Sequence, residues 1–315
     1  METALYGPGG FFTTSGPADH FRTSVHASPL FAGALLRLVE AVDAALGRPA
    51  VLQVVDVGAG RGELLAALHA STTDPRVRFV GVEVAPRPAG LPAEIDWQRH
   101  LPSAVDGLLI ATEWLDNVPL DIAEMDDDGR IRQVLVDRTG VETLGGDIDP
   151  ADRLWLSQWW PHARPGDRVE LGRPRDRAWA DAVATVRRGA ALAIDYGHVR
   201  EDRPALGTLT GFRDGRQVTP VPDGSCDLTA HVAVDSVAAA GGVAYRMVSQ
   251  RAALRALGVD GGRPLLSLAA TDPAGYLRAL GAAGAAAELT DPDGLGGHWW
   301  LLHEIGIEVH GTIGA

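Results

Sequence analysis

Val54-Val55-Asp56-Val57-Gly58-Ala59-Gly60-Arg61-Gly62-Glu63 is the stretch that decides how this chain folds. The apolar, β-branched residues before the first glycine predict a buried parallel strand, and the residues from Leu64 to Ala70 predict a helix. The three glycines let the backbone turn sharply and bring its N–H groups close to a ligand, because no Cβ obstructs the approach. A glycine-rich turn without a ligand is the alternative that this stretch leaves open.

A second strand follows at the spacing of a β-α-β unit. Residues 77–84 are mostly apolar, and Glu83 lies near the end of this run, about 25 positions after Gly58. At this spacing a β-α-β unit brings a carboxylate beside a ribose, where it accepts hydrogen bonds from the 2′ and 3′ hydroxyls. Strand, turn, helix, strand and acid in this order predict an adenosine-containing ligand.

Composition narrows the class of protein. The chain has 315 residues, 46% of them hydrophobic, and a formal net charge of −13, and every basic side chain is arginine. Such a chain buries a substantial core, and its charge argues against binding nucleic acid or an anionic membrane. The single cysteine, Cys226, excludes an intramolecular disulfide. Because residues 1–10 do not resemble a signal peptide and no apolar run has the length of a spanning helix, we expect a cytoplasmic protein.

Acidic residues follow two further apolar runs. Glu113 and Asp116 come after Leu108–Thr112, and Asp195 comes after Ala190–Ile194. In open α/β sheets the ligand crevice lies at the carboxyl ends of the strands, so these acids are candidate functional residues. Glu113 and Asp116 would share one face if a helix begins there, and one of them capping that helix is the alternative.

Other segments carry weaker signals. Ser28 and Pro29 predict the start of a helix that ends before Gly47. Two alternating stretches, 120–125 and 130–136, flank an Asp-Gly turn and predict a hairpin that interrupts the sheet pattern. We expect an irregular segment over 139–170, whose tryptophans either wall an acceptor pocket or pack the insertion. We also expect a helix over 176–188, a long loop over 207–227, a helix opening after an Asp227 N-cap, and a final strand over 298–305 at a sheet edge.

Five segments in order resemble the MidA family of class I S-adenosylmethionine-dependent methyltransferases, which includes the mitochondrial complex I assembly-factor methyltransferase. They are Phe21-Arg22-Thr23-Ser24 continuing to Ser28 and Phe31, Asp56-Val57-Gly58-Ala59-Gly60-Arg61-Gly62, Thr112-Glu113-Trp114-Leu115-Asp116-Asn117-Val118-Pro119, Ile194-Asp195-Tyr196-Gly197-His198, and Asp227-Leu228-Thr229-Ala230-His231-Val232. The last two are much more specific than a glycine motif. In the first segment this chain has His20 and His26 where the family has acids, and Val25 where it has proline.

The resemblance implies a Rossmann-like α/β sheet with helices on both faces, an N-terminal extension over residues 1–48, and a methyltransferase domain over 49–315 with an insertion at about 120–170. It implies S-adenosyl-L-methionine as cofactor, with the ribose on Glu83. The predicted cofactor-binding residues are Asp56, Gly58, Ala59, Gly60, Gly62, Glu83 and Val84.

The activity that the resemblance implies is methylation of protein arginine. A carboxylate pair would hold the guanidinium, and Glu113 and Asp116 are the first choice, followed by Asp195 and by His231 as a base. Methylation of a small molecule and a cofactor-binding assembly protein without catalysis are alternatives, and a nicotinamide-dependent dehydrogenase is a weaker one. If the family acids hold a cationic acceptor, His20 and His26 favour a different substrate. The sequence predicts no metal site and leaves the oligomeric state open.

Overall fold

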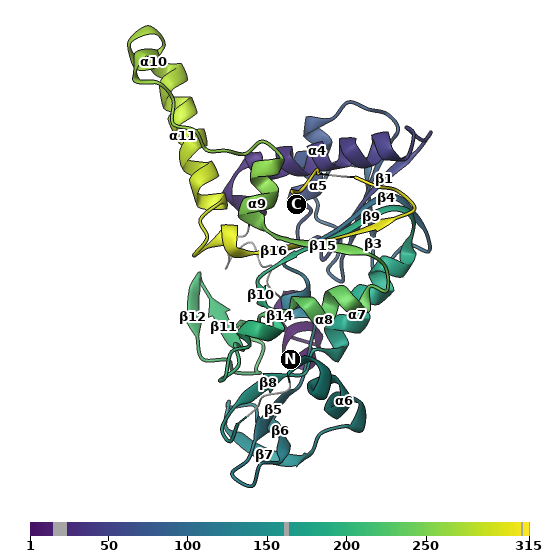
Figure 1. Ribbon diagram of the computed structural model, residues 1–315, viewed down its shortest axis with the longest axis vertical. Coiled ribbons are helices and arrows are strands. Elements are labelled where there is room, and N and C mark those ends of the chain that lie inside the picture. Colours follow the sequence, from purple (N-terminus) through teal and green to yellow (C-terminus); the bar gives the residue numbers. More distant parts are fainter. Residues whose placement is uncertain (15–23, 161–163, 310, 315) are drawn as a thin grey trace. The chain divides into compact units, whose positions relative to one another are not determined.

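The computed structural model describes residues 1–14, 24–160, 164–309 and 311–314, and the chain divides into two compact units (Figure 1). Unit 1 consists of residues 1–21, 113–184 and 195–243, and unit 2 of residues 22–112, 185–194 and 244–315. The predicted insertion at about 120–170 lies within the middle segment of unit 1, and the predicted domain boundaries stay a prediction. His20 lies outside the described residues.

Unit 2 is built on a seven-stranded sheet in the order β15-β16-β9-β4-β1-β2-β3. Its strands are β1 (Leu52–Val57), β2 (Val77–Val82), β3 (Ile95–Gln98), β4 (Val105–Thr112), β9 (Val186–Asp195), β15 (Tyr245–Ser249) and β16 (Trp299–Ile305). β1 is parallel to β2 and β4, β2 to β3, and β4 to β9, whereas β15 is antiparallel to β16. The predicted α/β class, a central and mostly parallel sheet flanked by helices, is confirmed.

Unit 2 also contains the helices α3 (Ser24–Ala27), α4 (Pro29–Ala45), α5 (Glu63–Ser71), α9 (Gln250–Ala256), α10 (Leu266–Thr271), α11 (Pro273–Leu289) and the short 3-10 helix η4 (Leu295–Gly297). The helices other than α10 contribute to the burial of the apolar side chains of this sheet. α4 begins as predicted, because the Ser28 hydroxyl accepts a hydrogen bond from the Leu30 N–H at 3.1 Å and Pro29 occupies the first turn. Its buried Phe31, Leu35 and Leu38 join β1, β4 and β9 in one apolar core.

Unit 1 combines short sheets with helices. Its elements are α1 (Glu2–Tyr6), α2 (Phe11–Thr14), the 3-10 helix η2 (Leu115–Asn117), β5 (Ile122–Met125), β6 (Ile131–Val136), β7 (Glu142–Asp147), α6 (Pro150–Trp159), β8 (Arg168–Glu170), α7 (Arg173–Thr185), β10 (Gly197–His198), the 3-10 helix η3 (Arg200–Asp202), β11 (Thr210–Arg213), β12 (Arg216–Val218), β13 (Asp227–Thr229), β14 (Val232–Ala233) and α8 (Val234–Ala240). Three sheets have the orders β7-β6-β5-β8, β12-β11-β13 and β10-β14. The predicted hairpin is confirmed as β5 and β6.

Several local expectations were wrong, mostly where a strand depends on a distant partner. The predicted helix after Asp227 is instead strand β13, because residues 227–229 pair with β11. The expected loop over 207–227 contains β11 and β12, and the segment 139–170 contains β7, α6 and β8. The helix predicted over 176–188 ends at Thr185, and the chain continues directly into β9. The last strand, β16, is not at the edge, since β15 lies outside it.

Among the helices that the structure describes, none combines the length and the apolar character needed to cross a membrane. Within the same described residues, no group of three or more histidine, cysteine or acidic side chains is placed to hold a metal ion.

Candidate active site

The glycine turn of unit 2 requires glycine for conformational reasons. Gly58, Gly60 and Gly62 have φ values of 73°, 57° and 77°, in the left-handed region that other residues rarely adopt. A Cβ on Gly62 would also lie 2.6 Å from a methyl group of Leu91. The N–H groups of Gly58 and Ala59 donate to the Val82 carbonyl at 3.0 and 3.2 Å. These bonds hold the turn against the end of β2, so these two N–H groups are occupied within the protein.

Glu83 lies beside this turn. One of its carboxylate oxygens accepts from the Gly60 N–H at 3.0 Å, and the other accepts from Val84 and Ala85 N–H groups at 2.6 and 3.1 Å. Three backbone donors therefore fix the carboxylate at the place where the β-α-β spacing predicts a ribose. A carboxylate has about four acceptor positions, so capacity remains for a hydroxyl group.

Asp56 is buried in β1, immediately before the turn. Burial, and then the nearby carboxylates of Glu83 and Glu63, raise the pKa of Asp56 to about 8. The side chain is therefore mainly protonated at pH 7. The structure thus brings the predicted cofactor residues Asp56, Gly60 and Glu83 together in unit 2.

In unit 1, Asp116 is the centre of a buried polar cluster. One of its carboxylate oxygens accepts hydrogen bonds from the hydroxyls of Tyr196 and Thr229, the latter at 2.7 Å. The other oxygen is buried and has no hydrogen-bond partner among the described residues. Burial raises the pKa of Asp116, and the bonds from Tyr196 and Thr229 oppose this shift. Asp116 therefore keeps one unused acceptor atom in the interior of the unit.

Asp195 links the backbone of η2 to the backbone at Tyr196 through hydrogen bonds to its carboxylate. One oxygen accepts from the N–H groups of Leu115 and Asp116 at 3.0 and 3.2 Å, and the other accepts from the Tyr196 N–H at 3.0 Å. Burial and the neighbouring Asp116 carboxylate raise the pKa of Asp195. With both oxygens bonded to backbone, Asp195 fixes the position of Asp116.

Glu113 does not share a helical face with Asp116, because the predicted helix is only the three-residue η2 and begins after Glu113. Glu113 itself has φ 49°, a left-handed conformation that is uncommon for a residue with a Cβ. Such backbone strain is concentrated at functional sites, where the surrounding structure imposes it. The conformation makes Glu113 a stronger functional candidate than its sequence context alone.

The two histidines of the cluster differ in exposure. His231 is more exposed than His198, its ring centroid lies 5.2 Å from that of Tyr196, and the burial of part of the side chain lowers its pKa. Its ring is therefore mainly neutral at pH 7 and can accept a proton. His198 is buried, and burial together with the Arg203 guanidinium lowers its pKa to about 3. His198 is therefore permanently neutral near pH 7.

Sequence reasoning missed two members of this cluster, Arg175 and Glu170. The buried Arg175 guanidinium donates to the carbonyls of Ala230 and His231, both at 2.9 Å, and to that of Asp116. Glu170 is buried, accepts from the Thr208 and Leu209 N–H groups, and has one carboxylate oxygen without a partner among the described residues. Neither belongs to a recognisable motif, and only their three-dimensional neighbours reveal them.

The tryptophans pack the interior of unit 1. Trp155 and Trp160 are buried in one apolar cluster with residues of β5, β8 and α6. The Trp155 indole N–H donates to Asp176 at 2.7 Å and to the Ser236 hydroxyl at 2.9 Å. Of the two interpretations that the sequence left open, packing is the one that the structure supports.

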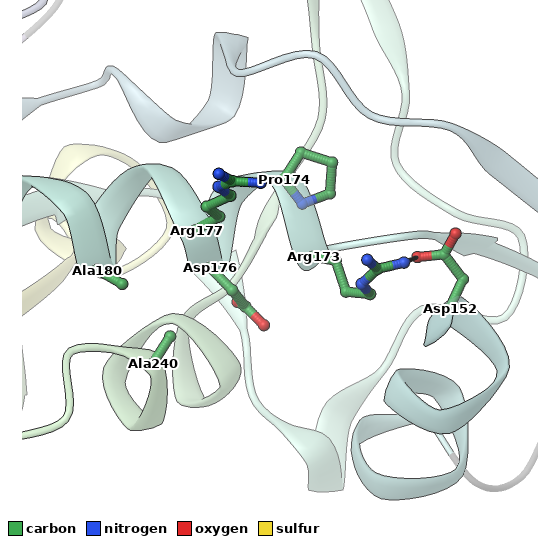
Figure 2. A pocket seen from close by; sticks show the side chains of 7 residues that line it. All are labelled: Asp152, Arg173, Pro174, Asp176, Arg177, Ala180 and Ala240. Atoms are coloured by element: carbon green, nitrogen blue, oxygen red, sulfur yellow. Dashed lines mark hydrogen bonds and ion pairs between the residues drawn. The ribbon is translucent and has the colours of Figure 1, made fainter. Parts of the chain in front are cut away.

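A separate cavity of about 560 Å³ lies next to α7 (Figure 2). Its lining combines charged and small apolar side chains, namely Asp152, Arg173, Pro174, Asp176, Arg177, Ala180 and Ala240. Arg173 forms an ion pair with Asp152 at 2.9 Å across one end of it (Figure 2). None of the predicted site residues lines this cavity.

The fold and the glycine turn define a class I methyltransferase-like α/β protein, and comparison with known proteins gives the family. A family model described as "Putative S-adenosyl-L-methionine-dependent methyltransferase" matches residues 34–252. The chain belongs to this family of S-adenosyl-L-methionine-dependent methyltransferases. No curated protein matches the sequence significantly.

Two crystal structures from Burkholderia thailandensis resemble the whole chain. One is described as a "likely methyl transferase" bound to S-adenosyl-homocysteine; it is 26% identical, with a TM-score of 0.80, and the match covers 98% of this chain and 87% of that one. The other is a native structure of a protein of the same superfamily, 26% identical with a TM-score of 0.79, covering 100% and 88%. Together with the family, they establish S-adenosyl-L-methionine as the cofactor of this chain and displace the nicotinamide alternative.

Proposed function

We propose that this chain methylates arginine side chains of proteins, as the MidA family does. The observation that carries the proposal is the acidic polar cluster of unit 1, in which Asp116 and Glu170 each keep one buried carboxylate oxygen without a partner among the described residues. A buried unpaired acceptor costs about 1–3 kcal/mol, so its persistence indicates a function. A guanidinium supplies several N–H donors in a fixed geometry, and the unpaired Asp116 oxygen is an acceptor that such a donor would satisfy.

Three of the four segments that carry the MidA resemblance outside the glycine turn meet in this cluster, namely those that begin at Thr112, Ile194 and Asp227. Asp116 of the first accepts from Tyr196 of the second and Thr229 of the third. The second and third also pair directly, as the parallel strands β10 and β14. Arg175 ties the first motif to the third through backbone carbonyls. This convergence supports a common role for segments that are far apart in the sequence.

The chemistry divides between the cofactor and the chain. S-adenosyl-L-methionine, when bound by Asp56, the glycine turn and Glu83, supplies an activated methyl group. The chain must then hold the acceptor, orient one nitrogen and remove a proton. In this proposal Glu113 and Asp116 bind the guanidinium by charge-assisted hydrogen bonds. His231, which is neutral at pH 7, takes the proton that the nitrogen loses.

Glu113→Gln tests the proposal. The amide keeps the size of the side chain but removes its charge, so turnover on an arginine peptide should fall by about 100-fold or more. The dissociation constant of S-adenosyl-homocysteine, measured by calorimetry, should change by less than about twofold, because Glu113 is not among the predicted cofactor residues. Asp121→Asn, at an exposed acid of the same unit, is the matched control and should behave as wild type.

The assay uses labelled S-adenosyl-L-methionine and paired peptides that contain arginine or lysine at the same position. Methylarginine in the hydrolysed product, formed by wild type and not by Glu113→Gln, supports the proposal. Wild-type turnover by Glu113→Gln would show that Glu113 does not bind the acceptor and would contradict its proposed role. Product on small molecules alone would favour the small-molecule alternative. Cofactor binding with no product in any assay would favour the assembly protein.

A further inference from the structure

The helices α10 and α11 extend away from the seven-stranded sheet of unit 2 (Figure 1). The inner end of α11 is anchored, since Ala283, Ala286 and Leu289 are buried. The rest of the pair carries exposed leucines: Leu265, Leu266, Leu277 and Leu280 are 78%, 77%, 67% and 41% exposed. Large apolar side chains gathered on one exposed element indicate a surface that another molecule covers.

One face of α11 has a distinctive order of side chains. Leu277, Leu280, Gly281 and Gly284 are three or four residues apart and therefore lie on the same side of the helix. Both glycines are exposed, and a Cβ built on either of them would have no atom within 4 Å. Along this face of α11, two exposed leucines, Leu277 and Leu280, are thus followed by two glycines, Gly281 and Gly284, that have no side chain and no neighbouring atoms above them.

This order is complementary to itself. The midpoint between Leu277 and Gly284 is also the midpoint between Leu280 and Gly281. If a second α11 packs antiparallel around that point, Leu277 lies over the partner's Gly284 and Leu280 over the partner's Gly281. In a two-fold symmetric interface the same surface of each copy meets the other, so each contact occurs twice. Such an interface therefore needs a surface that is complementary to itself.

Charge also favours a second copy as the occupant. The chain has a net charge of −13, so two copies repel each other over most of their surfaces. Between residues 261 and 287 the only charged side chains are Arg263, Asp272 and Arg278, so this segment is nearly neutral. Two copies can meet here without bringing like charges together. The net charge opposes docking of the same face on an anionic membrane.

We propose that α11 forms the interface of a homodimer, with two copies antiparallel across Leu277, Leu280, Gly281 and Gly284. Sedimentation of the full chain at about 1–100 µM should show a dimer with twice the mass of the 33.1 kDa chain. Leu277→Ser combined with Leu280→Ser should raise the dimer dissociation constant at least about tenfold. The matched control replaces Leu154 and Leu206, leucines of unit 1 that are 70% and 76% exposed, by serine, and should leave dimerisation unchanged.

Disulfide trapping tests the register. The chain's own Cys226 is buried, so the introduced thiols are the accessible ones. A mixture of Leu277→Cys and Gly284→Cys chains should form a mixed disulfide on oxidation, because the antiparallel register places these positions opposite each other. Each variant alone should cross-link far less.

A wild-type chain that sediments as a monomer throughout this range overturns the proposal. So does a dimer that the serine substitutions at 277 and 280 do not weaken. Cross-linking of Leu277→Cys chiefly with itself would indicate a parallel pairing and would equally contradict it. Because the replaced leucines are exposed, the doubly substituted chain should keep the far-UV circular dichroism spectrum of wild type, and this measurement excludes misfolding as the cause of dissociation.

Discussion

Glu83 shows at the scale of one residue how a binding group is prepared. Its carboxylate accepts hydrogen bonds from three backbone N–H groups, those of Gly60, Val84 and Ala85. The same bonds hold the glycine turn in position, so one side chain both shapes the turn and offers acceptors to a ribose. A substitution that removes the Glu83 carboxylate should therefore weaken both the glycine turn and ribose binding.

Glu83→Gln is expected to weaken both functions. Glutamine presents one acceptor oxygen and an NH₂ group, which opposes a backbone N–H instead of accepting from it. The dissociation constant of S-adenosyl-homocysteine should rise at least about tenfold, and the free energy of unfolding should fall by about 1–3 kcal/mol. Calorimetry and urea unfolding measure the two effects. Glu94→Gln, at an exposed position of the same unit, is the control, and wild-type binding by Glu83→Gln would contradict the assigned role.

Asp116 and Asp195 were both predicted as candidate acids at strand ends, but their hydrogen-bond partners in the structure differ. Asp195 accepts hydrogen bonds from three backbone N–H groups, whereas one oxygen of Asp116 has no hydrogen-bond partner in the described part of the chain. The sequence predicts that acids gather at this end of the strands because parallel strands end together. It could not predict how their hydrogen bonds divide, since the donors come from Thr229, Tyr196 and η2, which are distant in sequence.

At the scale of the element, α4 is the clearest case of a helix set by local chemistry. Ser28 caps it through the Leu30 N–H, and the apolar stripe from Phe31 to Val42 packs into the core. Ser28→Ala leaves an N–H without its partner and should lower the free energy of unfolding by about 1 kcal/mol. Urea unfolding at constant pH measures this change.

The control for that experiment is Ser71→Ala in α5. The Ser71 hydroxyl is exposed and donates to the Ala67 carbonyl within its own helix, so its removal should change stability by less than about 0.5 kcal/mol. Equal effects of the two substitutions would show that the Ser28 cap is not specific.

Strands were predicted well in the parallel sheet and in the β5–β6 hairpin, whose turn has a local signature, and poorly at β13. β1, β2, β4 and β9 each contain a run of buried apolar residues, because both faces of the sheet are covered there. β13 has no such local signature, and its extended conformation comes from pairing with β11. A local pattern therefore predicted a helix after Asp227 that the tertiary pairing excludes.

For the whole molecule, the buried acids give a pH dependence of stability. Burial raises the pKa of Asp56 to about 8, that of Asp227 to about 7 and that of Asp176 to about 6. Each of these carboxyls binds its proton more tightly in the folded chain than in the unfolded one, where the pKa is about 3.9. Their stabilising contribution is therefore complete below about pH 4 and is lost as the pH rises through 6–8.

Without cofactor, the free energy of unfolding should fall by at least about 2 kcal/mol between pH 5 and pH 9, measured by urea unfolding at fixed ionic strength. Asp56→Asn keeps the side chain neutral and should reduce that slope. The variant should be more stable than wild type at pH 9, and the difference should shrink toward pH 5. Stability that rises over this range, or an identical slope in Asp56→Asn, would contradict the assignment.

The sequence by itself determined the class of sheet, the glycine turn and the place of Glu83. These depend on short-range patterns: apolar runs, φ-permissive glycines and the fixed length of a β-α-β unit. Only the tertiary structure decided which acids keep an unpaired oxygen, that Arg175 and Glu170 join the cluster, and that Gly281 and Gly284 lie open beside exposed leucines. The reason is physical, because burial and hydrogen-bond partners are properties of what surrounds a residue in space, and those surroundings come from segments far away along the chain.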